Sequence, residues 1–237
     1  MNNGAQRVAR FAMLTALSLV LGYFDRAIPL SAVLGGAVPG IKLGLANTVL
    51  LYAVYMMDWK DCVLLMLAKV GLSGFLFGSL SAMLYSLAGG ALSLAVMLAV
   101  RRKPEAGALA AGGLAGAAMA LMLARNPHPR GQTLWCVILT GAACCAGIAG
   151  FLIMKRKRIA GAVGTSLAGA VAHNVGQMVV AGAVLRTPQL LYTYLPVLIG
   201  IGAAVGCLTG IIAQRVLHVM RKERGAFGAH DPLRPQK

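Results

Sequence analysis

Apolar segments that are each long enough to cross a lipid bilayer follow one another along most of this chain. A transmembrane helix needs about 20 consecutive apolar residues, with a range of about 17 to 25. Segments of this kind cover roughly 8–24, 41–57, 61–79, 81–100, 107–124, 134–154, 162–185 and 189–215. The pattern therefore predicts an all-α integral membrane protein with about eight transmembrane helices.

The composition agrees with this prediction. Of the 237 residues, 59% are hydrophobic and 12% are charged, whereas soluble domains contain about 25% charged residues. No polar linker divides the apolar segments, so we expect a single transmembrane helical domain over residues 1–220. The polar segment 221–237 is expected to be a disordered cytoplasmic tail.

The basic residues indicate the orientation in the membrane. With the N-terminus in the cytoplasm, sixteen Lys and Arg residues fall on the cytoplasmic side and five on the external side. By the positive-inside rule both termini are then cytoplasmic, and loops 25–39 and 125–133 are external. The net charge of +16 lies in short loops and tails, so we interpret it as membrane orientation and not as nucleic-acid binding. The expected location is the cell (plasma) membrane.

Polar residues at membrane depth are the first candidates for function, because an unsatisfied polar group in lipid is costly. Lys42 and Asn47 lie near the start of the second predicted helix, and Lys69 lies well inside the third. Lys42 could instead reach the interface and Asn47 could bond a neighbouring helix. We expect no acidic residue inside a helix to pair with Lys69, which leaves it to face a wet cavity, carbonyl groups or an anionic ligand.

A second polar group interrupts the seventh predicted helix. His173 and Gln177 are four residues apart and Asn174 and Gln177 three apart, so their side chains share much of one helix face. They could form a hydrogen-bonded clamp between helices or part of a binding site. Together with Lys42, Asn47 and Lys69 they predict a site for a polar or anionic small molecule.

Other chemistry has little support in the sequence. There is no phosphate-binding loop, no Asp-Asp-x-x-Asp pair and no Cys-x-x-Cys spacing, so we predict no cofactor, no metal site and no catalytic residues. Asp58 and Asp61 are interpreted as part of a solvated cytoplasmic turn. An enzyme is therefore not the favoured interpretation.

Three ordered motifs carry a resemblance to a known family. The motifs are Pro39-Gly-Ile-Lys-Leu-Gly-Leu-Ala-Asn47, Leu84-Tyr-Ser-Leu-Ala-Gly-Gly90 and Ser166-Leu-Ala-Gly-Ala-Val-Ala-His-Asn-Val-Gly-Gln177. They resemble the heptaprenyl diphosphate synthase component I family, also called the Gx transporter family. Its members are similar to the S components of energy-coupling-factor importers. The resemblance implies a six-helix bundle with an outward-opening ligand pocket, and it carries over Pro39, Gly40, Lys42, Asn47, His173, Asn174 and Gln177 as motif residues.

The resemblance covers roughly 8–102 and 159–215. We interpret 103–157 as an inserted two-helix hairpin. Because the hairpin adds an even number of spans, the helices before and after it keep their orientation in the membrane. We also expect that this hairpin can be deleted without loss of the core fold.

Two functions follow from these observations. The main hypothesis is a substrate-binding subunit that takes up an unidentified small molecule with a membrane coupling subunit and its ATPases. Ala12 and Ala16, four residues apart on the first helix, would dock that coupling subunit, as the resemblance to S components implies, although internal packing is an alternative. The second hypothesis is a non-catalytic membrane subunit of prenyl diphosphate synthesis. A structural membrane scaffold is a third interpretation.

Overall fold

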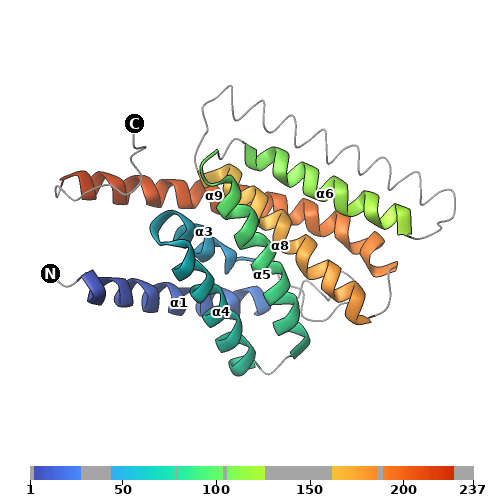
Figure 1. Ribbon diagram of the computed structural model, residues 1–237, viewed down its shortest axis with the longest axis horizontal. Coiled ribbons are helices and arrows are strands. Elements are labelled where there is room, and N and C mark those ends of the chain that lie inside the picture. The colour runs from blue at the N-terminus through green and yellow to red at the C-terminus, as the bar shows by residue number, and fades with distance from the viewer. Residues whose placement is uncertain are drawn as a thin grey trace.

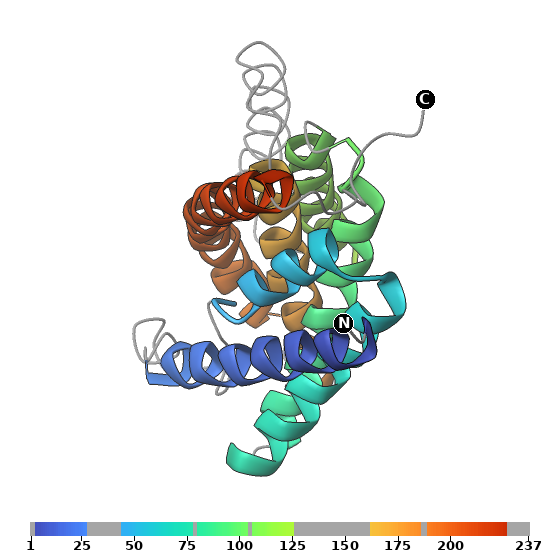
Figure 2. The same cartoon turned by 90° about the vertical axis from the view of Figure 1, so that its left-hand side faces the viewer.

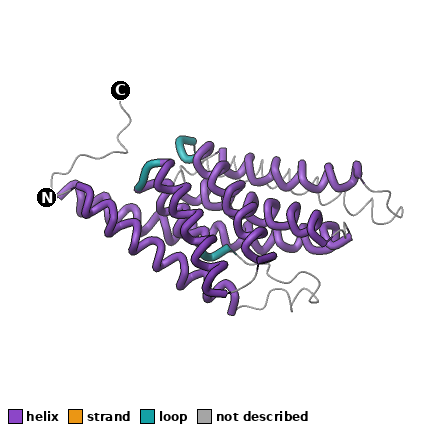
Figure 3. The backbone as a smooth tube through the Cα atoms, turned by 60° about the horizontal axis from the view of Figure 1, so that its bottom comes forward, coloured by secondary structure: helices purple, strands orange, loops and turns teal. Residues whose placement is uncertain are grey.

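The computed structural model describes residues 3–27, 44–77, 80–103, 106–125, 162–185 and 189–226. These residues form seven helices and no strand. The helices are α1 (Asn3–Ala27), α3 (Asn47–Met56), α4 (Trp59–Phe77), α5 (Leu80–Val100), α6 (Ala106–Arg125), α8 (Ala162–Leu185) and α9 (Gln189–Ala226). They run side by side in a bundle (Figures 1 and 3).

The helices confirm the all-α prediction and are consistent with a membrane bundle. Among the described residues, four stretches are long and apolar enough to cross a membrane: Gly4–Ala27, Leu80–Val100, Ala162–Leu185 and Tyr194–Met220. The number of eight spans and the orientation of the termini remain predictions. The predicted helix 134–154 lies outside the described residues.

The second predicted helix is shorter than its apolar segment. A helix was expected over 41–57, but α3 begins only at Asn47. Gly44 has a φ of 86°, a conformation that glycine adopts at little cost and that does not continue a right-handed helix. The turn that follows is closed by hydrogen bonds from the N–H of Asn47 to the Gly44 carbonyl and from the N–H of Thr48 to the Leu45 carbonyl.

Helix α8 is the centre of the bundle. It packs against α5, α6 and α9, and it is buried along most of its length (Figure 2). Its small residues allow neighbouring backbones to come close. A Cβ atom built on Gly176 would lie 2.8 Å from the carbonyl oxygen of Ala88 on α5. Such a contact is shorter than side chains tolerate, so the α5–α8 crossing depends on glycine.

Glycine residues also allow close packing between α8 and α9. Gly202, Gly206 and Gly210 repeat every four residues on α9 and form one seam toward α8. A Cβ atom at Gly206 would lie 2.8 Å from the Cβ of Ala170, and one at Gly210 would lie 2.7 Å from the Cα of Val163. In lipid, where apolar surface gains little by leaving the solvent, close packing of small residues is a main source of helix association.

Helix α6 belongs to this core as well. Ala108, Ala111 and Ala115 on α6 are buried, and Gly107 lies against the backbone of Gly164 on α8. Since α6 is the first part of the segment 103–157, deleting that segment would uncover a face of α8. The packing therefore argues against our expectation that the segment can be removed, and the deletion itself remains to be made.

Helix α1 lies on the other side of the bundle and contacts α3 and α4. At its N-terminal end Arg7 donates two hydrogen bonds to Asp61, of 2.9 Å from Nε and 2.5 Å from a terminal nitrogen. The interpretation of Asp61 as part of a solvated turn was wrong, because Asp61 lies in the first turn of α4 and is paired with α1.

Candidate functional site

A group of polar side chains is buried where α1, α3, α4, α5 and α8 meet. Asp25 on α1 is only 1% exposed, Lys69 on α4 is 9% exposed and His173 on α8 is 4% exposed. Charged groups at such depth in an apolar bundle are costly, and in membrane proteins they generally face each other or a polar cavity. Their convergence from three different helices marks this region as the candidate site.

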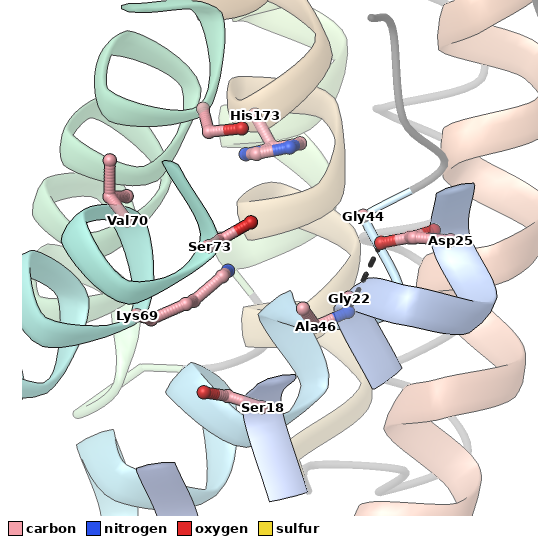
Figure 4. Close-up of a pocket in the computed structure, with 10 residues that line it drawn as sticks. Ser18, Gly22, Asp25, Gly44, Ala46, Lys69, Val70, Ser73 and His173 are labelled. Carbon is pink, nitrogen blue, oxygen red and sulfur yellow. Dashed lines mark hydrogen bonds between the residues drawn. The ribbon is translucent and has the colours of Figure 1, made fainter. Parts of the chain in front are cut away.

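The side chains surround a small cavity (Figure 4). The cavity volume is about 20 Å³, which is enough for about one water molecule. The cavity is lined by Ser18, Gly22, Asp25, Gly44, Ala46, Lys69, Val70, Ser73, Ser86 and His173.

Lys69 is linked to two other helices by a chain of hydrogen bonds. Its Nζ atom donates to the Oδ1 atom of Asn47 over 3.3 Å, and the Nδ2 atom of Asn47 donates to the Oγ atom of Ser93 over 3.1 Å. Lys69 and Asn47 were both predicted as site residues, and the structure places them in contact. The chain joins α4, α3 and α5, so the amide of Asn47 orients the ammonium group that faces the cavity.

Asp25 is the residue that the sequence analysis missed. We placed it at the start of an external loop, but α1 continues to Ala27 and Asp25 lies in its last turn. Its Oδ2 atom accepts a hydrogen bond of 3.3 Å from the backbone N–H of Ala46, beside the N-terminus of α3. A carboxylate is favourable there because helix N-terminal N–H groups lack partners within the helix.

The helical spacing of residues along α1 could have identified Asp25 as a site residue. Ser18, Gly22 and Asp25 are separated by four and three residues, so they share one face of α1, and all three line the cavity. The statement that no acidic residue lies within a helix was also wrong, since Asp25 and Asp61 are both helical.

The polar group on α8 divides into two parts. The side chains of His173 and Gln177 are hydrogen-bonded to each other, and His173 lines the cavity. They face α5 at Gly89, where a Cβ atom would lie 2.7 Å from the Nδ1 atom of His173. Asn174 points to α9 instead, and its Nδ2 atom donates to the carbonyl oxygen of Leu198 over 2.7 Å. Asn174 therefore fits the interhelical clamp that was the alternative to a ligand contact.

The remaining predicted residues are less informative. Pro39, Gly40 and Lys42 lie outside the described residues. Ala12 and Ala16 are exposed on α1, beside the exposed apolar side chains of Met13 and Leu17. This face is therefore open to lipid or to a second protein.

A second small cavity lies among α3, α5, α8 and α9. Asn47, Ser166 and Thr209 line it, and the hydroxyl groups of Ser166 and Thr209 are 3.1 Å apart. Its lining contains no charged residue among those that the structure describes. The charges of the site are thus confined to the first cavity, which is the better candidate for binding.

The chemistry available at the first cavity is that of binding. Asp25, Lys69, His173 and three serines can donate and accept hydrogen bonds from several directions. Within the described parts of the chain, no group of three or more His, Cys, Asp or Glu residues is placed to hold a metal ion. Asp25, near the end of α1, and Gly44, shortly before α3, both line the cavity.

Comparison with known proteins identifies the family. A family model described as heptaprenyl diphosphate synthase component I matches residues 14–126 and 129–216. These ranges include the segment 103–157 apart from residues 127 and 128, although we expected no resemblance there. No curated protein and no solved structure matches the chain. Because the match extends over most of the sequence, the chain belongs to the heptaprenyl diphosphate synthase component I family.

Proposed function

We propose that this protein is a non-catalytic, multi-pass membrane subunit that binds a small polar ligand in the cavity between α1, α3, α4, α5 and α8. The observation that carries the proposal is the burial of Asp25, Lys69 and His173 around one cavity of an apolar helical bundle. Polar side chains that only stabilise a membrane bundle can bond directly across helices, as Asn174 does. Asp25 and Lys69 also bond across helices, but unlike Asn174 they line a cavity, where their charged groups can contact a ligand.

The family suggests the setting in which the subunit acts. The name component I implies a partner component, so we propose that the chain supports prenyl diphosphate synthesis as the membrane member of a two-part system. Ionisation of a prenyl diphosphate normally uses clustered carboxylates that hold metal ions. Since the described residues contain no such cluster, the proposal assigns the chemistry to the partner.

The test of ligand binding starts from the full-length protein purified from membranes. Molecules that co-purify with the protein are identified by mass spectrometry and compared with those of Lys69→Met and of a control, Lys60→Met. Lys60 is exposed and lies over the ring of Trp59, away from the cavity. We expect a small molecule that is retained by the wild type and by Lys60→Met and lost from Lys69→Met. Equal retention by all three, or no retained molecule, would refute binding at this cavity.

Uptake of a small molecule is the second candidate function. Two observations favour it: the cavity is lined by Asp25 and Gly44, which are close in sequence to the loop that we predict to be external, and the apolar face of α1 around Ala12 and Ala16 is exposed. In this setting both termini are cytoplasmic, and α1 docks on a membrane coupling subunit with ATPases. Replacing Ala12 and Ala16 with Leu should abolish co-purification of that subunit and leave ligand binding unchanged. Transport by the purified protein alone in liposomes would contradict the need for such a partner.

Two measurements separate the candidates. Deleting the gene for this protein should reduce prenyl diphosphate formation if the protein is a subunit of prenyl diphosphate synthesis. The deletion should instead reduce uptake of the co-purifying molecule if the protein is a transport subunit. The same Lys69→Met variant should reproduce whichever loss is found, because both settings use the same cavity.

A further inference from the structure

We infer that the outer face of α9 near its C-terminal end binds the headgroup of an anionic phospholipid, and that Arg215 holds the phosphate of this lipid. The surface is separate from the cavity, so the inference goes beyond the proposed function and does not depend on it. It comes from the exposure of a single arginine within an apolar helix that is long enough to cross a membrane.

Burial gives this part of α9 (red in Figure 1) an inner face and an outer face. Ala213 and Leu217 are buried and belong to the same apolar cluster as residues of α3 and α4. Ile211 and Val219 are each more than half exposed. Arg215 is four residues from both of them, so it shares their face of the helix, and its side chain is exposed as well.

The position of Arg215 along α9 places it near the membrane surface. It is the only Asp, Glu, Lys or Arg between Tyr194 and Met220. This stretch has 27 residues, or about 40 Å of helix, whereas the hydrocarbon layer of a bilayer is about 30 Å thick. Arg215 precedes Met220 by about 7.5 Å along the helix, so its long side chain can reach the headgroups while Ile211 stays beside the acyl chains.

An exposed arginine at this level favours an anionic partner, because charged residues of spanning helices otherwise face the bundle interior or a wet cavity. Within the parts of the chain that the structure describes, Arg215 has no ion pair. A phosphodiester suits its guanidinium group, since two N–H donors can bind two phosphate oxygens side by side. The acyl chains of the same lipid can lie along the exposed apolar side chains of α9, a surface that a soluble phosphate or an acidic protein would leave unused.

The charge of the residues that follow favours a headgroup with net negative charge. Residues 221–224 add three basic residues and one acidic residue, and α9 continues through them to Ala226. From Arg215 to Arg224 the chain thus has four basic residues and one acidic residue, a net charge of +3 with His218 neutral. Basic clusters at the end of a membrane-spanning helix attract anionic lipids, whereas a zwitterionic headgroup brings a cation of its own.

Stabilisation of the helix end does not account for Arg215. Basic residues in the last turn of a helix interact favourably with its C-terminal carbonyl groups, and this effect falls off within that turn. It can explain the basic residue Arg224. Arg215 lies about three turns before Ala226, so its position is explained better by the membrane surface.

The experiment measures lipid binding to the full-length protein in a neutral detergent by native mass spectrometry. The probes are dioleoyl phosphatidylglycerol, dioleoyl phosphatidylcholine, glycerol phosphate and a hexaglutamate peptide. The proteins are the wild type, Arg215→Gln, Arg215→Lys and the control Lys60→Met. Lys60 is also exposed, but it is next to Asp61 in sequence and lies over the ring of Trp59. The control therefore removes one positive charge at a place where an acidic residue is close.

We expect the wild type to bind phosphatidylglycerol more tightly than phosphatidylcholine. Arg215→Gln should bind phosphatidylglycerol about 5-fold more weakly, the usual contribution of one basic residue beside an anionic membrane surface, with a smaller effect on phosphatidylcholine. Arg215→Lys keeps the positive charge and should keep the preference for phosphatidylglycerol. Lys60→Met should bind both lipids as the wild type does.

Three results would overturn the inference. Equal affinity of the wild type for the two lipids would show that the anionic headgroup is not selected. Unchanged binding of phosphatidylglycerol by Arg215→Gln would place the lipid elsewhere. Displacement of phosphatidylglycerol by an equal concentration of glycerol phosphate or hexaglutamate would assign the face to a soluble phosphate or to an acidic protein. None of these results concerns the cavity, so co-purification with Lys69→Met tests the proposed function separately.

Discussion

Replacing Gly89 with Ala tests whether the site depends on the close crossing of α5 and α8. A Cβ atom at Gly89 would lie 2.7 Å from both the carbonyl oxygen and the Nδ1 atom of His173, and 2.8 Å from the Cγ atom of Gln177. Ordinary contact begins at 3.4 Å, so the two helices are too close by 3.4 − 2.7 = 0.7 Å for this methyl group. The carbonyl oxygen belongs to the α8 backbone and cannot rotate away.

The expected magnitude follows from two opposing effects. Ala is favoured over Gly in a helix by about 0.8–1 kcal/mol, whereas overpacking costs typically about 1–3 kcal/mol. Since a backbone atom is involved, we expect the upper part of the cost and a net loss of about 1–2 kcal/mol in the free energy of unfolding. For a chain of this size the unfolding temperature should fall by roughly 2–8 °C.

The assay is thermal unfolding in detergent, with two matched controls. Gly71 on α4 and Gly113 on α6 are helical glycines with open space around a built Cβ atom. Gly71→Ala and Gly113→Ala should therefore keep the helix-propensity gain and raise the unfolding temperature by roughly 1–4 °C. If Gly89→Ala is as stable as the two controls, then α5 and α8 do not cross as closely as described and the position of His173 would need revision.

Three other predictions test different parts of the molecule. Asn174→Ala should lower the free energy of unfolding by about 0.6–1.7 kcal/mol through loss of the bond to α9, with little change in ligand affinity. Equilibrium unfolding and ligand titration test this, and a large loss of affinity with unchanged stability would show that Asn174 contacts the ligand. A double-mutant cycle of Arg7→Gln and Asp61→Asn should give only a weak coupling, because the Arg7 side chain is 60% exposed and solvent screens the pair. A strong coupling would indicate a buried pair. A cysteine at position 126 in a cysteine-free background should react with an impermeant thiol reagent in intact cells, and protection there with reactivity at position 157 would invert the predicted orientation.

The helices themselves could be predicted from the sequence because their signal is local. Seven of the eight predicted apolar segments correspond to described helices, and the remaining one, 134–154, lies outside the described residues. The errors lie at the ends. Hydropathy placed the end of the first helix before Asp25, since a carboxylate lowers the mean hydropathy. The helix can nevertheless include Asp25, because the N–H of Ala46 donates a hydrogen bond to its carboxylate.

The site could be predicted only in part, for a related reason. Spacing along α8 correctly grouped His173 with Gln177, which are hydrogen-bonded, but it could not assign Asn174 to a different neighbour. One residue is a rotation of about 100° on a helix, enough to turn Asn174 from α5 toward α9. Which helix lies on each side depends on packing between distant segments, and spacing within one helix contains no information on that.

The position of Lys69 shows how these limits combine. Its depth in an apolar segment correctly marked it as unusual, and its bond to Asn47 joins two helices that the sequence treats separately. The sequence placed no acidic residue near it, whereas Asp25 lines the same cavity. An anionic ligand for Lys69 stays a prediction, and so does the choice between a role in prenyl diphosphate synthesis and a role in uptake. Because both roles use this cavity, the identity of the molecule that co-purifies with the wild type and is lost from Lys69→Met is the measurement that separates them.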